Sequence, residues 1–160
     1  MQLKEQQRNY YKTLQDYAAL IEATLKEQAP SFSGSLRDSI TGEIEFDQNG
    51  TANVGIYMAE HGTYINEGVN GAKSSYIENK NSRFRYKDKM PPISALQAWA
   101  NAKSINPWAL RYSIYTKGIR RNPFIERSFS DGTLDKMATD IAESIWTDFY
   151  VSLEDKKINK

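Results

Sequence analysis

Residues 43–56 read Glu-Ile-Glu-Phe-Asp-Gln-Asn-Gly-Thr-Ala-Asn-Val-Gly-Ile, and this stretch decides the fold. Apolar residues occupy every second position on both sides of Asn49-Gly50, which is the period of a half-buried strand. Asn-Gly favours a tight reversal, because these residues adopt positive φ at low cost. The stretch therefore predicts a β-hairpin with one apolar face and one solvated face.

A helix before the hairpin is predicted to cover its apolar face. Over 10–29, apolar residues recur at the three- and four-residue spacing of one helical face, and Pro30 ends the helix. After Pro30, Ser35 with Asp38 can cap a short helical turn that carries Leu36.

Helical periodicity returns after Pro92. Asn106-Pro107 and Asn122-Pro123 each place a capping residue before a proline at the first helical position, which predicts two helix starts. A long closing helix is predicted from Thr133. Its apolar face is predicted at Leu134, Met137, Ala138, Ile141, Ile145 and Phe149.

The expected fold class is α+β, because the strands cluster instead of alternating with helices. We expect a long N-terminal helix packed on a small antiparallel sheet, made of the β-hairpin and a candidate extra strand. Short helices and a long C-terminal helix follow. The tryptophans fall at helical positions and are predicted to lie in the core: Trp99, Trp108 and Trp146.

Length and composition bound the function. The chain has 160 residues and a formal net charge of +1, so we expect a single domain over 1–160 without a global attraction to nucleic acid or membranes. It has no cysteine, which excludes disulfides, thiolate metal sites and thiol nucleophiles. Without a long apolar run or the apolar core of a signal peptide, it is expected to be soluble and made in a cytoplasm. Residues 154–160 are predicted to be a frayed tail.

The segment 68–92 is predicted to be a long flexible loop or arm. Basic and aromatic residues alternate within 80–89: Lys80, Arg83, Phe84, Arg85, Tyr86, Lys87 and Lys89. This period predicts a strand over 83–87 that pairs with the hairpin. Three interpretations stay open, namely a solvated loop, a protein-binding strand, and a phosphate-contacting arm in which Phe84 and Tyr86 stack on bases.

Residues with catalytic chemistry are sparse. His61 is the single histidine and has no cysteine or second histidine to complete a site, so we expect a turn or surface residue. Glu43 and Glu45 share the solvated face of a strand, and the spacing of Glu60 and Glu67 does not predict convergence on a sugar bond. No nucleophile elbow, phosphate-binding loop or dinucleotide motif occurs. We therefore expect no enzyme activity, no catalytic residue, no metal and no cofactor.

Three short segments form an ordered set of motifs. Residues 29–40 read Ala-Pro-Ser-Phe-Ser-Gly-Ser-Leu-Arg-Asp-Ser-Ile, 64–69 read Tyr-Ile-Asn-Glu-Gly-Val, and 118–125 read Gly-Ile-Arg-Arg-Asn-Pro-Phe-Ile. Their order, over roughly 10–149, resembles that of the tail-completion and neck proteins of tailed bacteriophages. Asn122 departs from the arginine that this family often places before the proline.

The resemblance implies a small non-catalytic protomer that forms a homo-oligomeric ring at the head-to-tail junction of the virion, assembled in the host cytoplasm. Implied partners are portal or connector proteins, tail tube proteins and, non-specifically, DNA in the channel, with no membrane. Motif residues with an implied structural role are Gly34, Leu36, Gly68, Pro123 and Phe124. Candidates for subunit or DNA contacts are Arg83, Phe84, Arg85, Tyr86, Lys87 and Lys89.

The residues themselves leave two alternatives to a ring subunit. One is a small phage-encoded cell-wall hydrolase, motivated by chain length and scattered carboxylates. The other is a DNA-binding module that uses the arm 80–89. Open sheet edges favour the ring, because unpaired edges in a soluble protein are blunted or paired with a neighbour, and the long loop is a natural clasp between copies.

Overall fold

The chain adopts an α+β fold made of two compact units. The computed structural model describes residues 8–30, 34–49, 51–129 and 132–158. Unit 1 comprises Met1–Thr24, Thr41–Tyr57 and Ser128–Lys160, and unit 2 comprises Leu25–Ile40 and Met58–Arg127. That the whole chain behaves as a single domain stays a prediction.

Unit 1 contains the expected hairpin. Strands β1 (Thr41–Phe46) and β2 (Ala52–Tyr57) pair antiparallel, with Ile44 opposite Val54. Exposure alternates along β1 as the sequence predicts, except that Phe46 at its end is about half exposed. The side chain of Asp47 accepts hydrogen bonds from the backbone N–H groups of residues 49 and 51, each at 2.8 Å. Gly50 of the predicted reversal lies outside the described residues.

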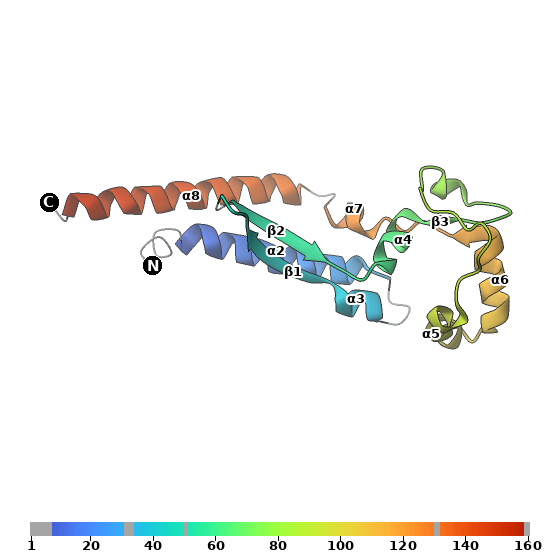
Figure 1. Ribbon diagram of the computed structural model, residues 1–160. Coiled ribbons are helices and arrows are strands. Elements are labelled where there is room, and N and C mark those ends of the chain that lie inside the picture. The colour runs from blue at the N-terminus through green and yellow to red at the C-terminus, as the bar shows by residue number, and fades with distance from the viewer. Residues whose placement is uncertain (1–7, 31–33, 50, 130–131, 159–160) are drawn as a thin grey trace. The chain divides into compact units, whose positions relative to one another are not determined.

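Helix α2 (Arg8–Gln28) covers the apolar face of the hairpin, as predicted. Figure 1 shows α2 beside β1 and β2, and the Tyr11 ring lies 5.2 Å from the Phe46 ring, centroid to centroid. Gly42 permits a close approach, because a Cβ at this position would lie 2.7 Å from the backbone oxygen of Ala18. The Glu22 carboxylate accepts the Gly42 N–H at 2.9 Å. A polar bond thus joins helix and strand beside their apolar contact.

Helix α8 (Thr133–Ile158) lies beside α2 in unit 1 (Figure 1). Asp148 accepts the backbone N–H groups of Asn9 and Tyr10 in the first described turn of α2, and Tyr17 donates to Asp140. A carboxylate at the first turn of a helix is stabilised by the positive end of the helix dipole. The predicted frayed tail overlaps α8 through residue 158, and residues 159–160 lie outside the described stretches.

The apolar face predicted for α8 is only partly covered. Met137 and Ile141 are half buried, but Leu134 is 53% exposed and Ile145 is 51% exposed. The side chain of Phe149 lies outside the described residues. The core prediction for Trp146 is wrong, since this side chain is 61% exposed. Residues two positions apart along a helix point to nearly opposite sides, so Trp146 lies opposite Ser144, which is buried.

Unit 2 contains mainly short elements. These are α3 (Ser35–Ser39), α4 (His61–Glu67), β3 (Val69–Asn70), the 3₁₀ helix η1 (Ile77–Asn79), α5 (Ile93–Lys103), α6 (Pro107–Lys117), β4 (Gly118–Ile119) and most of α7 (Phe124–Ser128). Helix α4 was not predicted, because 61–67 has no helical apolar period. Strands β3 and β4 form a second antiparallel pair.

Helices α5 and α6 carry a core cluster of their own. Its buried members are Leu96, Ala100, Leu110 and Ile114, with Tyr86, Trp99 and Ile119 packed against it. The predicted start of α6 is confirmed, since the Asn106 side chain accepts the Trp108 N–H at 2.9 Å. The core prediction for Trp108 is wrong, because position 108 faces away from this cluster and its side chain is 64% exposed.

The predicted pairing of the arm with the hairpin is wrong. Arg85 instead forms a parallel bridge with Asn70 of β3. The Asn70 N–H donates to the carbonyl of Phe84, and the Tyr86 N–H donates to the carbonyl of Asn70, both at 2.9 Å. Strand periodicity indicated that this segment would be extended, but it carries no information about which strand lies beside it.

Among the described residues, no helix combines the length and the apolar character that crossing a bilayer requires.

Candidate functional site

The segment 68–92 is anchored to unit 2 by a buried asparagine. The side-chain nitrogen of Asn79, which is fully buried, donates to the carbonyls of Val69 (3.0 Å) and Ile119 (2.7 Å). Its side-chain oxygen accepts the Arg121 N–H at 2.8 Å. One amide therefore joins η1, β3 and the chain after β4. Sequence reasoning did not single out Asn79, because its partners lie far away along the chain.

Gly68 lies directly against the side chain of Asn79, which leaves no room for a side chain at position 68. Its φ is +75°, and an added Cβ would lie 2.3 Å from the side-chain oxygen of Asn79. The Gly68 carbonyl accepts the Ser82 hydroxyl at 2.6 Å. The expectation that Gly68 is required for its backbone conformation agrees with this geometry.

The three motif segments meet in unit 2. The Asn122 N–H donates to the Ile65 carbonyl, and the Ile125 N–H donates to the side chain of Asn66, both at 3.0 Å. These bonds join the second motif to the third. The first motif contributes Leu36, which is buried and lies against Gly62 of α4.

The remaining motif residues have structural positions. Gly34 precedes α3 with φ of +75°, and its carbonyl accepts the Asp38 N–H at 2.8 Å. Pro123 is half buried before α7, and Phe124 is fully buried. The prediction that Phe124 fills the core is confirmed.

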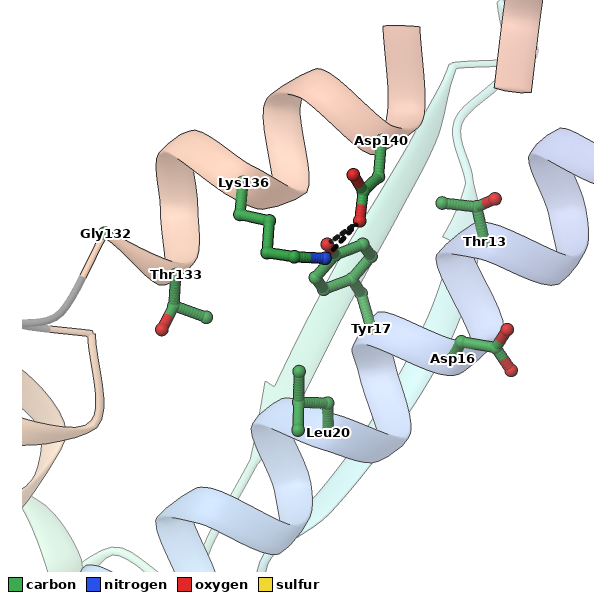
Figure 2. Close-up of a pocket in the computed structure, with 8 residues that line it drawn as sticks. All are labelled: Thr13, Asp16, Tyr17, Leu20, Gly132, Thr133, Lys136 and Asp140. Atoms are coloured by element: carbon green, nitrogen blue, oxygen red, sulfur yellow. Dashed lines mark hydrogen bonds and ion pairs between the residues drawn. The ribbon is translucent and has the colours of Figure 1, made fainter. Parts of the chain in front are cut away.

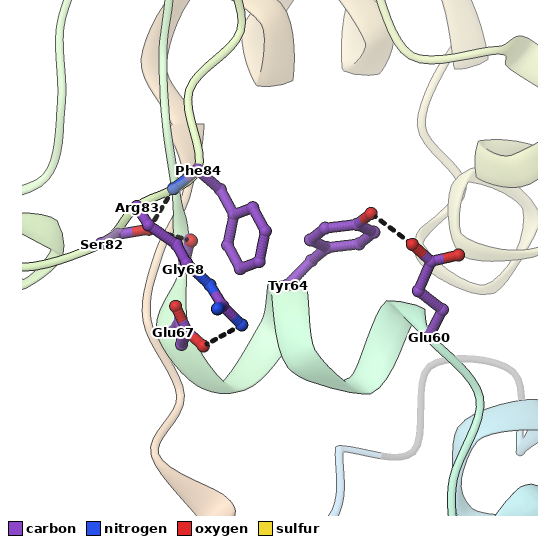
Figure 3. Close-up of polar contacts among 7 residues, drawn as sticks. All are labelled: Glu60, Tyr64, Glu67, Gly68, Ser82, Arg83 and Phe84. Carbon is purple, nitrogen blue, oxygen red and sulfur yellow. Dashed lines mark hydrogen bonds and ion pairs between the residues drawn. The ribbon is translucent and has the colours of Figure 1, made fainter.

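The arm 80–89 separates its basic and aromatic residues. Phe84 and Tyr86 are half buried, whereas Arg83, Arg85 and Lys87 are exposed. Figure 3 shows the Phe84 ring facing Tyr64 of α4 edge-on, with 4.7 Å between their centroids. Both aromatic rings of the arm thus pack against the protein, and its cations face outward. Lys80 and Lys89 are exposed as well.

Tyr86 packs against α6. Its ring lies 6.3 Å from that of Tyr115, centroid to centroid, and burial raises the pKa of Tyr86. The Tyr115 hydroxyl donates to the Lys87 carbonyl at 2.7 Å. The arm is therefore joined to α6 at the backbone of Lys87.

Glu60 directly precedes α4 and Glu67 is its last residue, so the two glutamates lie at opposite ends of the helix (Figure 3). Glu67 forms an ion pair with Arg83 at 3.1 Å, and Glu60 accepts the Tyr64 hydroxyl at 2.8 Å. This hydrogen bond to a carboxylate raises the pKa of Tyr64. Each carboxylate has its own partner, and the two do not converge on one point.

Helix α6 exposes a cluster that the sequence analysis did not select. Trp108 and Tyr112 are exposed, and Arg111 lies between them in sequence. The Arg111 guanidinium lies 5.7 Å from the centroid of the Trp108 ring, and Lys73 lies 5.7 Å from that of Tyr112. We call Lys73, Trp108, Arg111 and Tyr112 the α6 surface. The signal was present in their i, i+3, i+4 spacing, which places all three α6 residues on one side of a helix.

Charge is divided between the two units. Unit 2 contains 14 lysines and arginines against 7 aspartates and glutamates, a net charge of +7. Unit 1 contains 7 against 13, a net charge of −6, so the two values sum to the +1 of the whole chain. The net charge of +1, from which we expected no global electrostatic attraction, is therefore the sum of one strongly acidic and one strongly basic unit.

Unit 1 contains an open groove of about 580 Å³ between α2 and α8. Figure 2 shows the Tyr17 hydroxyl and the Lys136 ammonium converging on Asp140, to which both donate hydrogen bonds. The hydrogen bond from Lys136, followed by that from Tyr17, lowers the pKa of Asp140. Three of the polar side chains of the groove, Tyr17, Lys136 and Asp140, thus pair with one another.

Metal-site chemistry is not assembled in the described part of the chain. No group of three or more histidine, aspartate or glutamate side chains is placed there to hold a metal ion. His61 is exposed at the start of α4, as a surface residue was expected to be.

Comparison with protein-family models, with curated proteins and with solved structures finds no match to this chain.

Proposed function

We propose that this protein is a structural subunit of a tailed-bacteriophage particle. One copy would occupy each position of a ring at the head-to-tail junction, as a tail-completion, neck or connector component. Its function is to bind copies of itself and the portal and tail tube proteins on either side, in a virion assembled in the host cytoplasm. The observation that carries the proposal is the division of charge between the units.

Opposite charges on two parts of one chain favour contact between unlike surfaces. Unit 1 of one copy, at −6, attracts unit 2 of the next, at +7, whereas contacts between like units are repulsive. A contact between unlike surfaces leaves one of each free, so more copies add until the rotation closes a ring. An antiparallel pair also satisfies the charges, and the measured mass distinguishes the two.

The surface of unit 1 supplies apolar contact area as well. Leu134, Ile145 and Trp146 are each more than half exposed on α8. Apolar groups of this size gathered on one helix mark a protein-binding surface more often than isolated exposed residues do. Both strands of the β1–β2 pair are also edge strands within their sheet, with backbone groups that a neighbour can pair.

The direct test is the mass and shape of the purified protein. Light scattering and negative-stain electron microscopy are expected to show rings at about 0.1 M salt, formed alone or with the portal and tail tube proteins of the same particle. Raising salt to about 1 M shortens the Debye length from about 10 Å to about 3 Å and is expected to weaken them. A monomer that ignores all of these partners would overturn the proposal.

A matched pair of charge reversals tests the role of the division itself. Glu43→Lys with Glu143→Lys changes unit 1, and Glu27→Lys with Asp88→Lys changes unit 2; all four side chains are exposed. Both double variants raise the net charge by the same amount. Only the unit 1 pair is expected to weaken assembly, because it reduces the charge of unit 1 from −6 to −2 and so weakens its attraction to unit 2 of a neighbour. Equal effects would show that net charge alone matters.

A further inference from the structure

We propose that the α6 surface binds a single nucleic-acid strand, with bases stacked on Trp108 and Tyr112 and phosphates held by Arg111 and Lys73. The proposed ring needs contacts only between proteins, so this binding is a separate activity. It also differs from the arm 80–89, whose aromatic rings are turned to the protein.

The two rings are available for stacking. Trp108 is 64% exposed and Tyr112 is 54% exposed, and they lie one turn apart on α6. Two large rings exposed side by side form an apolar patch of the kind that marks a binding surface. Stacking on bases covers such rings and tolerates any sequence, because every base has a π face.

The two cations are held next to these rings. The Nε of Arg111 donates to the Pro91 carbonyl at 2.9 Å, which fixes the guanidinium beside Trp108 and leaves its terminal nitrogens for a ligand. The Lys73 ammonium lies 3.3 Å from the Tyr112 hydroxyl. Among the described residues, no ion pair joins either cation to a carboxylate.

The surroundings of the α6 surface add positive charge. Unit 2 has a net charge of +7, and the hydrogen bond from Tyr115 of α6 to the Lys87 carbonyl holds the backbone of the arm next to α6. Such a region attracts a polyanion over several ångströms and releases its counterions on contact. The arm can thus extend the phosphate path beyond the four residues of the surface.

The side chains favour a single strand over a duplex. Rings that stand out from a helix surface need unstacked bases, which a duplex does not offer, while the cations alone would serve either ligand. Each ring of the α6 surface also has a cation beside it, so one base and its neighbouring phosphate can be bound together. The chemistry therefore points to an unpaired polynucleotide, bound without sequence preference.

The test measures binding of a fluorescein-labelled oligo(dT) of about 15 nucleotides by anisotropy. Trp108→Ala is expected to weaken binding by about 5- to 150-fold, the loss that one stacked base represents. Trp146→Ala is the matched control, since Trp146 is 61% exposed but belongs to the acidic unit 1, and it is expected to leave binding unchanged. Circular dichroism establishes that both variants fold.

Salt dependence tests the cations. Arg111→Gln and Lys73→Ala are each expected to reduce the slope of log affinity against log salt by about 0.7, the value for one phosphate of a single strand. Lys103→Ala, an exposed lysine at the end of α5 outside the α6 surface, serves as the control. Loss of slope only with Arg85 or Lys87 replaced would assign binding to the arm and overturn the inference.

Other outcomes separate this inference from the proposed function. If Trp108→Ala and Arg111→Gln prevent ring formation but leave oligo(dT) affinity unchanged, the α6 surface contacts the acidic unit of a neighbour and the inference fails. If a duplex of equal length binds more tightly than the single strand, the stacking mode is wrong. Oligo(dT) binding by a protein that never assembles would support the inference and contradict the ring.

Discussion

The side-chain oxygen of Asn79 occupies the space into which any side chain at position 68 would project. An added Cβ on Gly68 would lie 2.3 Å from this oxygen, and the same oxygen accepts the Arg121 N–H. The second and third motif segments thus meet at one buried amide. The backbone positions of these two motif segments therefore depend on Asn79, which belongs to neither segment.

Gly68→Ala is expected to destabilise the protein by about 2–4 kcal/mol, because it combines backbone strain at positive φ with the clash on Asn79. Gly132→Ala is the matched control. Gly132 has a φ of +71° but nothing within 4 Å of an added Cβ, so strain of about 1 kcal/mol is its whole cost. Urea denaturation measures both losses. Equal losses would contradict a role for the contact with Asn79.

Asn79→Ala is expected to cost roughly 3 kcal/mol or more, since it leaves two carbonyls and one N–H without their partner in a buried site. Asn79→Asp should be worse near pH 7, because a carboxylate would face the carbonyls of Val69 and Ile119. This difference should shrink as acid protonates the new aspartate. Asn53→Ala, an exposed change on β2, is expected to be nearly neutral in the same denaturation series.

Phe124→Ala is expected to lower the free energy of unfolding by about 3–5 kcal/mol, because it opens a cavity at a fully buried ring. Phe46→Ala removes the same ring from a position that is about half exposed and should cost about 1 kcal/mol. Thermal unfolding followed by circular dichroism compares the two. A larger loss at Phe46 would mean that the unit 1 hairpin depends on its Tyr11 contact more than unit 2 depends on Phe124.

The stability of unit 1 should fall towards both pH extremes. Hydrogen bonds from Lys136 and Tyr17 lower the pKa of Asp140, so its contribution is present above the ordinary aspartate pKa of about 4 and is lost as pH falls through the depressed value. The hydrogen bond to Asp140 raises the pKa of Tyr17 and of Lys136, so their contributions are present below about pH 10 and lost as pH rises through the raised values.

Asp140→Asn tests this dependence. Melting temperatures between about pH 2 and pH 5 should change less in Asp140→Asn than in the unchanged protein, because the carboxylate that gains a proton is gone. Asp16→Asn is the control, because Asp16 is an exposed aspartate of the same groove that Figure 2 shows apart from the hydrogen bonds between Tyr17, Lys136 and Asp140. Parallel curves for Asp140→Asn and the unchanged protein would contradict the assignment.

Local signals in the sequence determined most of the elements. The period of two over 43–56 indicated the hairpin, and the cap and proline at Asn106-Pro107 indicated the start of α6, because capping and side-chain alternation act between near neighbours. Burial of Phe124 followed from its place after a helix start. The exposed cations of the arm were also identified, although not the element beside them.

Tertiary structure alone decided which surfaces are covered and which distant residues meet. Trp108 and Trp146 have helical positions like those of core residues, but a helix face is buried only where a neighbouring element reaches it. Helix α4 forms without an apolar period because packing around Gly62 overrides weak local preference. The total charge is a property of the sequence, whereas its division into −6 and +7 exists only because folding gathers separated segments into two units.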